Sequence, residues 1–241
     1  MRRAYLLAAL LPLLVASLPS QAQRHRRGAT IQAYPVLGVV TSQVQGDMLK
    51  GFKHWGFTGG VGAIVPLDGR DRWSLGLEAD FTQRGALEAS RSSLTPYRID
   101  LTLNYVDIPL MLHFHDRYGG MTFGLGACYG RLVQQPHGTL EYNPLYIIPD
   151  TSDMTFLKND LSAVASFRFT LWQGLKLELR GQYSLINVKR GWHFTEHLAG
   201  TGGQVKEHVS DCQNFSLSMR VMWIFGEPRS HKYKPNRRHR R

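Results

Sequence analysis

Apolar and polar residues alternate along most of this chain, and a period of two is typical of strands with one face exposed. The pattern is clearest from Leu101 to Gly130, where two alternating runs meet at a short stretch that contains Gly119 and Gly120. In the first run the apolar face is formed by Val106, Ile108, Leu110, Leu112 and Phe114. This pattern predicts a β-hairpin with one apolar face and one face that is polar or nearly bare.

The same alternation predicts eight strands in all. They cover roughly residues 31–42, 55–67 and 72–84, the two arms of the hairpin, residues 160–172 and 175–185, and a last strand that runs from Phe215 to Phe225. One irregularity stands out, because Leu101, Leu103 and Tyr105 are out of phase with the apolar residues from Val106 onward. An extra residue near Tyr105 would restore the phase, so a β-bulge is expected there.

The connections between these strands alternate in length. The links after the second, fourth and sixth strands are tight, whereas those near residues 43–54, 85–98, 134–159 and 189–213 are long. A transmembrane barrel shows this asymmetry, and a soluble exported barrel or sandwich has no reason to adopt it. The sequence therefore predicts an all-β fold: an eight-stranded antiparallel up-and-down transmembrane β-barrel, with short periplasmic turns, long extracellular loops and both termini in the periplasm.

The beginning of the chain predicts export. Arg2 and Arg3 precede an apolar run from Ala4 to Leu18, and small residues surround a cleavage site after Ala22. The run is shorter than the roughly 20 residues that a spanning helix needs, so residues 1–22 are expected to be a signal peptide. A short periplasmic segment, 23–30, then leads into the barrel at 31–226. The expected location is the bacterial outer membrane.

The hairpin also resembles a known family. YVDIPLMLHF followed by FGLGACYG, with KNDL at Lys158 to Leu161, is similar to the YxxIPLLL and GxG hairpin of the PorT-like outer-membrane β-barrels of the Bacteroidetes. The resemblance covers most of residues 31–226 and implies the same fold. Some members act in type IX secretion and gliding, so it implies a scaffold or accessory subunit of an envelope complex with protein partners.

The net charge of +11 comes from the two ends of the chain, because residues 28–226 hold 17 basic and 17 acidic residues. A basic chain usually suggests nucleic acid, but an exported fold without net charge argues against that partner. The tail at 227–241 is expected to be disordered and periplasmic. It would either stay solvated or dock on an acidic partner or lipid phosphate. Its basic residues are Arg229, Lys232, Lys234, Arg237, Arg238, Arg240 and Arg241.

The inward face of the predicted barrel carries four acids and four bases. These are Glu78, Asp80, Asp107 and Glu178 with Arg168, Lys176, Arg180 and Arg220. An eight-stranded barrel is only wide enough inside for side chains, and an unpaired buried charge costs several kcal/mol. The sequence therefore predicts a charge network that fills the lumen and leaves no aqueous pore.

Two histidine motifs resemble metal sites. His193–His197 fits the HxxEH pattern of inverted zinc proteases, but that chemistry needs a helix and a third ligand, and a loop is expected here. His113, His115 and Asp116 lie at a strand end, where polar groups of the lumen mouth are favoured over a metal or haem contact. No spacing of Ser, His and an acid suggests a triad. The sequence thus predicts that the protein is not an enzyme and holds no metal or cofactor. An outer-membrane lipid-modifying enzyme or protease is a remote alternative.

Two functional hypotheses remain open. The first is a non-enzymatic scaffold within an envelope complex, and the second is a stand-alone barrel that binds a ligand or small solute through its extracellular loops. Outer-membrane lipid is an expected partner of either. Cys128 and Cys212 are predicted to lie on opposite sides of the ring, beyond the roughly 7 Å that a disulfide allows between Cα atoms, and so to be free thiols.

Overall fold

The computed structural model describes residues 31–45, 51–68, 72–90, 97–116, 120–137, 140–141, 147–149, 155–172, 174–197 and 205–225. The predicted signal peptide, the segment 23–30 and the basic tail lie outside the described residues. Within the described ranges, no helix is long and apolar enough to cross a membrane.

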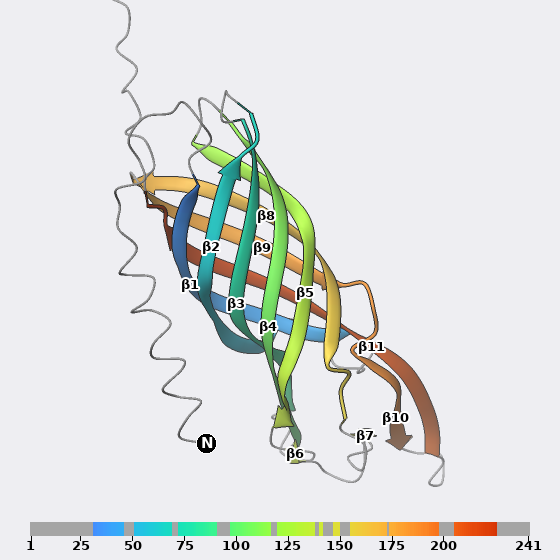
Figure 1. The fold of residues 1–241 in the computed structure, drawn as a ribbon. Helices are drawn as coiled ribbons and strands as arrows, with labels where there is room; N and C mark the ends of the chain where they lie inside the picture. Colours follow the sequence, from blue (N-terminus) through green and yellow to red (C-terminus); the bar gives the residue numbers. More distant parts are fainter. Residues whose placement is uncertain are drawn as a thin grey trace, which may run out of the picture. The chain divides into compact units, whose positions relative to one another are not determined.

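Eight strands form a closed antiparallel barrel, which confirms the predicted fold class (Figure 1). They are β1 (Gln32–Gln45), β2 (His54–Pro66), β3 (Trp73–Ser90), β4 (Tyr97–His115), β5 (Met121–His137), β8 (Asn159–Trp172), β9 (Leu175–Ser184) and β11 (Val205–Trp223). Each pairs with the next in this order, and β11 closes the ring on β1 with Met222 opposite Val36. Closure leaves no strand edge open along the wall.

The barrel is apolar outside and charged inside. Leu37 and Leu125 on the outer wall are 70% and 69% exposed, whereas Glu78 and Arg168 in the lumen are 2% and 1% exposed. A water-soluble barrel would show the reverse polarity, because the hydrophobic effect buries apolar side chains away from water. An outer wall of this kind fits lipid, so the fold is that of an outer-membrane β-barrel.

The two ends of the barrel differ. At the turn end, β2 joins β3, β4 joins β5 and β8 joins β9 through short links, of which the last contains Gly174 at a φ of 79°. The Gly174 carbonyl accepts a hydrogen bond of 2.7 Å from the amide of Ile224, just after β11. A positive φ there favours glycine, so the residue fits this tight turn.

At the opposite, loop end, strands continue where loops are expected. β3 runs to Ser90 and β4 begins at Tyr97, so the prediction of a long loop over 85–98 is wrong. Residues 189–213 are likewise mostly strand, because β10 (Lys189–His197) pairs with the first half of β11. Two short strands, β6 (Leu140–Glu141) and β7 (Ile147–Pro149), pair with β4 and β10. Figure 1 shows these added strands gathered at the loop end.

The predicted irregularity near Tyr105 is present, but it acts differently from the expectation. The register between β4 and β5 shifts twice, between Thr102 and Asn104 and between Asn104 and Tyr105, each time with one extra residue on β5. Leu101, Leu103 and Tyr105 stay inward, each at most 2% exposed, in phase with Asp107. These apolar residues pack on one another inside the barrel, as on the inward face of a soluble sheet. The expectation that a bulge turns them outward is wrong.

Apolar side chains close the lumen at both ends. The loop-end plug consists of Val44, Ala86, Leu101, Leu103, Tyr105, Leu132, Phe156, Val188 and Cys212. The turn-end cluster consists of Tyr34, Val36, Ile64, Met222 and Ile224. Cys128 lies between them beside Met111 and Val164, and both cysteines are buried free thiols. Cys212 lies within β11, which begins at Val205.

Candidate functional site in the barrel lumen

A network of six charged side chains spans the lumen between the two apolar clusters. The central network consists of Glu78, Asp80, Arg168, Glu178, Arg180 and Arg220, from β3, β8, β9 and β11. All six lie on the inward phase of their strands and are at least nine-tenths buried. Three acids face three arginines, so the central network carries no net formal charge.

The contacts of the central network are shared. Arg180 donates to Glu78 Oε2 at 2.8 Å and to Glu178 Oε1 at 2.9 Å. Arg220 donates to the same two carboxylates at 2.8 and 2.5 Å, and to Asp80 Oδ2 at 2.8 Å. Arg168 donates to Glu78 Oε1 at 3.0 Å and also bonds Glu178. Each glutamate therefore meets all three arginines, in the charge-assisted geometry that compensates for burial.

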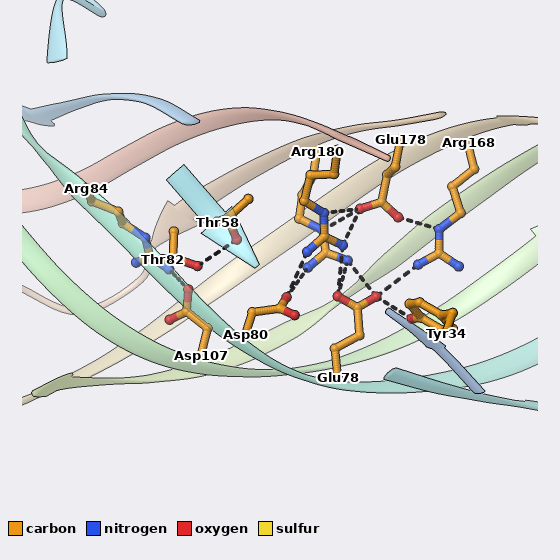
Figure 2. Close-up of polar contacts among 11 residues, drawn as sticks. Tyr34, Thr58, Glu78, Asp80, Thr82, Arg84, Asp107, Arg168, Glu178 and Arg180 are labelled. Carbon is orange, nitrogen blue, oxygen red and sulfur yellow. Dashed lines mark hydrogen bonds and ion pairs between the residues drawn. The ribbon is translucent and has the colours of Figure 1, made fainter. Parts of the chain in front are cut away.

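A tyrosine completes the network at the turn end. The Tyr34 hydroxyl donates to Glu78 Oε1 at 2.6 Å, and the Arg168 guanidinium lies 5.6 Å from the centre of the Tyr34 ring. Figure 2 shows Tyr34 beside Glu78, at the edge of the cluster away from Asp80. Tyr34 also belongs to the turn-end cluster, so it joins the charged and apolar parts of the lumen.

The bare inward faces of β2 and β5 provide the space for these long side chains. A Cβ at Gly62 would lie 2.5 Å from the Tyr34 ring and 2.8 Å from Glu78 Cγ. A Cβ at Gly124 would lie 2.5 Å from Ser166 Oγ and 2.8 Å from the ring of His113. These inward glycines thus leave room for the side chains of the residues paired with them on the neighbouring strands.

A second, smaller charge cluster lies nearer the loop end. In the Arg84 triad, the Arg84 guanidinium bonds Asp107 and donates to Asp160 Oδ2 at 2.9 Å. Ser162 donates to the same Asp160 oxygen at 3.0 Å, and the Arg84 guanidinium lies 4.9 Å from the centre of the Tyr105 ring. One arginine here serves two carboxylates, so the Arg84 triad carries a formal charge of −1.

The two clusters are separated by hydroxyl groups rather than by open space. Thr58 and Thr82 share a hydrogen bond of 3.2 Å between them, as Figure 2 shows. The polar cavity at this point has a volume of about 10 Å³ and is bordered by Asp80, Asp107 and Arg180. A single water needs roughly that volume, so this cavity is not a channel.

All eight lumen charges predicted from the sequence are buried, but they do not form one network. Asp107 belongs to the Arg84 triad, and Lys176 lies nearer the turn end, opposite Met222 of β11. Arg84 and Asp160 were not among the predicted residues. Both lie on the inward phase of predicted strands, because Arg84 shares the phase of Glu78 and Asp160 that of Arg168, but each is the terminal residue of its predicted strand.

The histidines at the turn end make structural contacts. His115 bonds Ser74 Oγ at 2.6 Å and Thr122 Oγ1 at 2.9 Å, which links three neighbouring strands. His113 is fully buried, and its ring centre lies 6.4 Å from that of His115. Among the described residues, no group of three or more His, Cys, Asp or Glu side chains could hold a metal ion.

The HxxEH string forms part of a strand and not the predicted loop. His193 to His197 lie in β10, paired with β11 from Val209 to Val205. Four residues of strand separate the Cα atoms of the two histidines by about 13 Å, whereas one helical turn would bring them together on one face. This geometry does not fit the zinc chemistry for which the motif is known.

Ser42 and His54 form a pair that the sequence did not suggest. Ser42 Oγ lies 3.3 Å from His54 Nδ1, and His54 Nε2 lies 3.2 Å from Thr102 Oγ1. The Ser42 hydroxyl donates to the Gly85 carbonyl at 3.0 Å and accepts from the Gly85 amide at 2.8 Å. Since its one proton is already given to Gly85, it has none for the histidine. A nucleophilic serine requires that proton transfer, so this pair is a structural link between β1, β2, β3 and β4.

Comparisons with known proteins do not show a family for this chain. No family model matches the sequence, so the resemblance to PorT-like barrels has no support, and no curated protein matches it. Among solved structures, Neisserial surface protein A (NspA) is 12% identical, with 81% of this chain and 98% of that chain covered and a TM-score of 0.42. Ail, the attachment invasion locus protein of Yersinia pestis, is 14% identical, with 80% and 98% covered and a TM-score of 0.42. OprG from Pseudomonas aeruginosa is 11% identical, with 83% and 99% covered and a TM-score of 0.36. At these TM-scores the similarity assigns neither a family nor a function.

Proposed function

We propose that this chain is a non-enzymatic, non-conducting outer-membrane scaffold that presents the β10–β11 hairpin to a protein partner in the cell envelope. The loop end then lies at the cell surface and both termini lie in the periplasm, in keeping with the usual asymmetry of such barrels. The observation that carries the proposal is the length of β11, which has 19 residues. A tilted spanning strand needs only about 9–11, so β11 continues well beyond the lipid.

The hairpin is built as an ordered surface. Its register runs from Trp192 opposite Ser210 to His197 opposite Val205. Asp211 fixes its base, because its carboxylate accepts hydrogen bonds from Asn187 Nδ2 at 2.7 Å and from the Gly191 amide at 2.8 Å. An ordered strand pair loses less conformational entropy on binding than a loop does, which favours recognition of a macromolecule.

Exposed apolar side chains lie on the same part of the chain. Leu185, Ile186 and Val209 are each at least 40% exposed close to the base of the hairpin. Exposed apolar side chains favour contact with a protein partner. A type IX secretion complex would be one such setting, although only the resemblance to PorT-like barrels points to it.

The filled lumen supports the proposal that the barrel conducts nothing. Charged side chains from opposite walls bond across it, and apolar clusters lie above and below them. Purified protein in planar bilayers should therefore show no steady channel. A reproducible open-pore conductance would overturn this part of the proposal.

The scaffold role is tested by removing the hairpin. Residues 193–209 are replaced by Asn-Gly, which can close the turn because Trp192 and Ser210 are paired. Detergent-extracted wild type and variant are compared by pull-down with mass spectrometry. The variant should keep its heat-modifiable migration and lose the partner. Deletion of residues 229–241 is the control, and a partner lost only with the tail would move the binding surface to the periplasm.

A stand-alone ligand-binding barrel is the second candidate, favoured by the same exposed hairpin. The same preparations discriminate between the scaffold and the ligand-binding barrel. The second candidate would be supported, and the first excluded, if the barrel is monomeric, recovers no protein and binds a small solute through residues 193–209. An outer-membrane enzyme finds no support in the described residues, since Ser42 and His54 are engaged in structural bonds.

A further inference from the structure

The outer wall carries a cationic group at the loop-end boundary of the lipid. On β5 the outward residues are apolar or aromatic from Met121 to Tyr129, and Arg131 follows them and is exposed. From Met121 to Arg131 the strand rises about 25 Å along the membrane normal, at about 3.3 Å per residue and a tilt of about 40°. The apolar band of such barrels has about that height, so Arg131 lies at headgroup level.

A second observation places the loop-end boundary of the lipid at the level of Arg131. Arg131 pairs with Val106 on β4, and Val106 is the last outward apolar residue before Tyr105, Leu103 and Leu101 turn to the lumen. On β4 the change from apolar residues outside to apolar residues inside thus occurs in the register of Arg131. Two independent features, strand height and the change of phase, give the same position.

The guanidinium of Arg131 is held in place by its neighbours. Asn159 Oδ1 accepts hydrogen bonds from Arg131 Nη1 at 3.0 Å and from the Tyr129 hydroxyl at 2.9 Å. Arg131 and Asn159 are directly paired between β5 and β8. One donor of the guanidinium is used in this bond, which leaves the others for an external acceptor.

Lys158 is a second exposed cation whose backbone lies close to this part of β5. The Lys158 carbonyl accepts a hydrogen bond of 2.7 Å from the Leu132 amide, so its backbone lies next to the residue that follows Arg131, and its side chain is exposed. Within the described part of the chain, Arg131 and Lys158 form no ion pair with a carboxylate. Two cations at the edge of an apolar wall would be stabilised by an anion at that level.

We propose that Arg131 and Lys158, with Asn159 and Tyr129, form a binding site for the phosphate of a lipid headgroup in the leaflet at the loop end. A guanidinium binds phosphate through two parallel N–H donors, and a lysine adds a point charge. The acyl chains would lie along the outer wall below, where Leu161 and Leu125 are exposed. A lipid is favoured over a free anion because the site borders this apolar wall.

Native mass spectrometry of the detergent-purified full chain tests the site with three probes: dioleoylphosphatidic acid, dioleoylglycerol and inorganic phosphate. The wild type should retain phosphatidic acid and neither of the others. The double variant Arg131→Gln with Lys158→Gln should weaken that binding roughly tenfold to thirtyfold. Arg190→Gln is the matched control, because Arg190 is exposed on β10 outside the barrel wall and should have no effect.

Heat-modifiable migration shows that each variant is folded. Equal retention of dioleoylglycerol would mean that the wall binds chains and not phosphate. Competition by inorganic phosphate at equal concentration would mean a site for soluble anions. Unchanged phosphatidic acid binding by the folded double variant would also overturn the proposal.

Discussion

The central network and the Arg84 triad both compensate buried carboxylates with arginines, but they do so with different numbers of contacts. In the central network three arginines share two glutamates and one aspartate, and each glutamate contacts all three arginines. In the Arg84 triad one arginine alone bridges Asp107 and Asp160. The first arrangement is redundant and the second is not.

Redundancy determines how each cluster should respond to the loss of a cation. A buried ion pair contributes little net stability when it is intact, but a buried charge that loses its partner is strongly destabilising. In the central network a carboxylate that loses one arginine keeps at least one other. In the triad both carboxylates depend on Arg84 for charge compensation among the described contacts. The sizes of the following effects test this difference.

The largest effect is expected for Arg84→Ala. It leaves Asp107 and Asp160 buried without a cation, which should lower the free energy of unfolding by about 3–5 kcal/mol. Urea titration of the barrel in detergent micelles, followed by heat-modifiable migration, measures the change. The control is Arg84→Ala combined with Asp107→Asn and Asp160→Asn, which removes every charge and should recover most of the loss. If Arg84→Ala is no more harmful than Arg180→Ala, the comparison fails.

A smaller effect is expected for Arg180→Ala. Glu78 and Glu178 keep Arg168 and Arg220, so the cost should be about 1.5–3 kcal/mol, the range for hydrogen bonds to charged groups. The same titration applies. Arg180→Ala with Arg220→Ala should cost more than the sum of the single variants, because Asp80 then loses both of its arginines. Simple additivity would show that the two arginines do not substitute for each other.

The smallest effect is expected for Tyr34→Phe. The ring stays in the turn-end cluster and only the hydroxyl bond to Glu78 Oε1 is lost. Because that oxygen still accepts from Arg168 and Arg180, the cost should be about 1 kcal/mol, below the range for a charged group that loses a donor it depends on. The measurement is again the urea concentration at which half of the protein is unfolded, with an unchanged slope of the unfolding free energy against urea concentration. Tyr34→Leu is the comparison that also removes the ring over which Arg168 lies. A larger loss for Tyr34→Phe than for Arg180→Ala would contradict the view that the central network tolerates single deletions.

Much of the wall was determined by the sequence alone. Alternation with a period of two depends only on neighbouring residues, so the inward phase of Glu78, Glu178 and Arg220 and the apolar outer face could be predicted without knowing any contact. The tight turns and the number of barrel strands followed from the same local pattern. The phase reversal at Tyr105 is also visible in the sequence, but the pattern alone predicts that a bulge turns Leu101, Leu103 and Tyr105 outward, whereas they lie inside the barrel.

Only the tertiary structure decided which charge meets which. Arg220 bonds Glu78 across 142 residues of sequence, and Arg84 meets Asp160 across 76. Those partners depend on the shear and closure of the barrel, which are set by hydrogen bonding between strands and leave no mark in a local pattern. The hairpin formed by β10 and β11 was hidden for a similar reason, because outside the lipid a strand gains stability from its pairing partner rather than from a repeated apolar face.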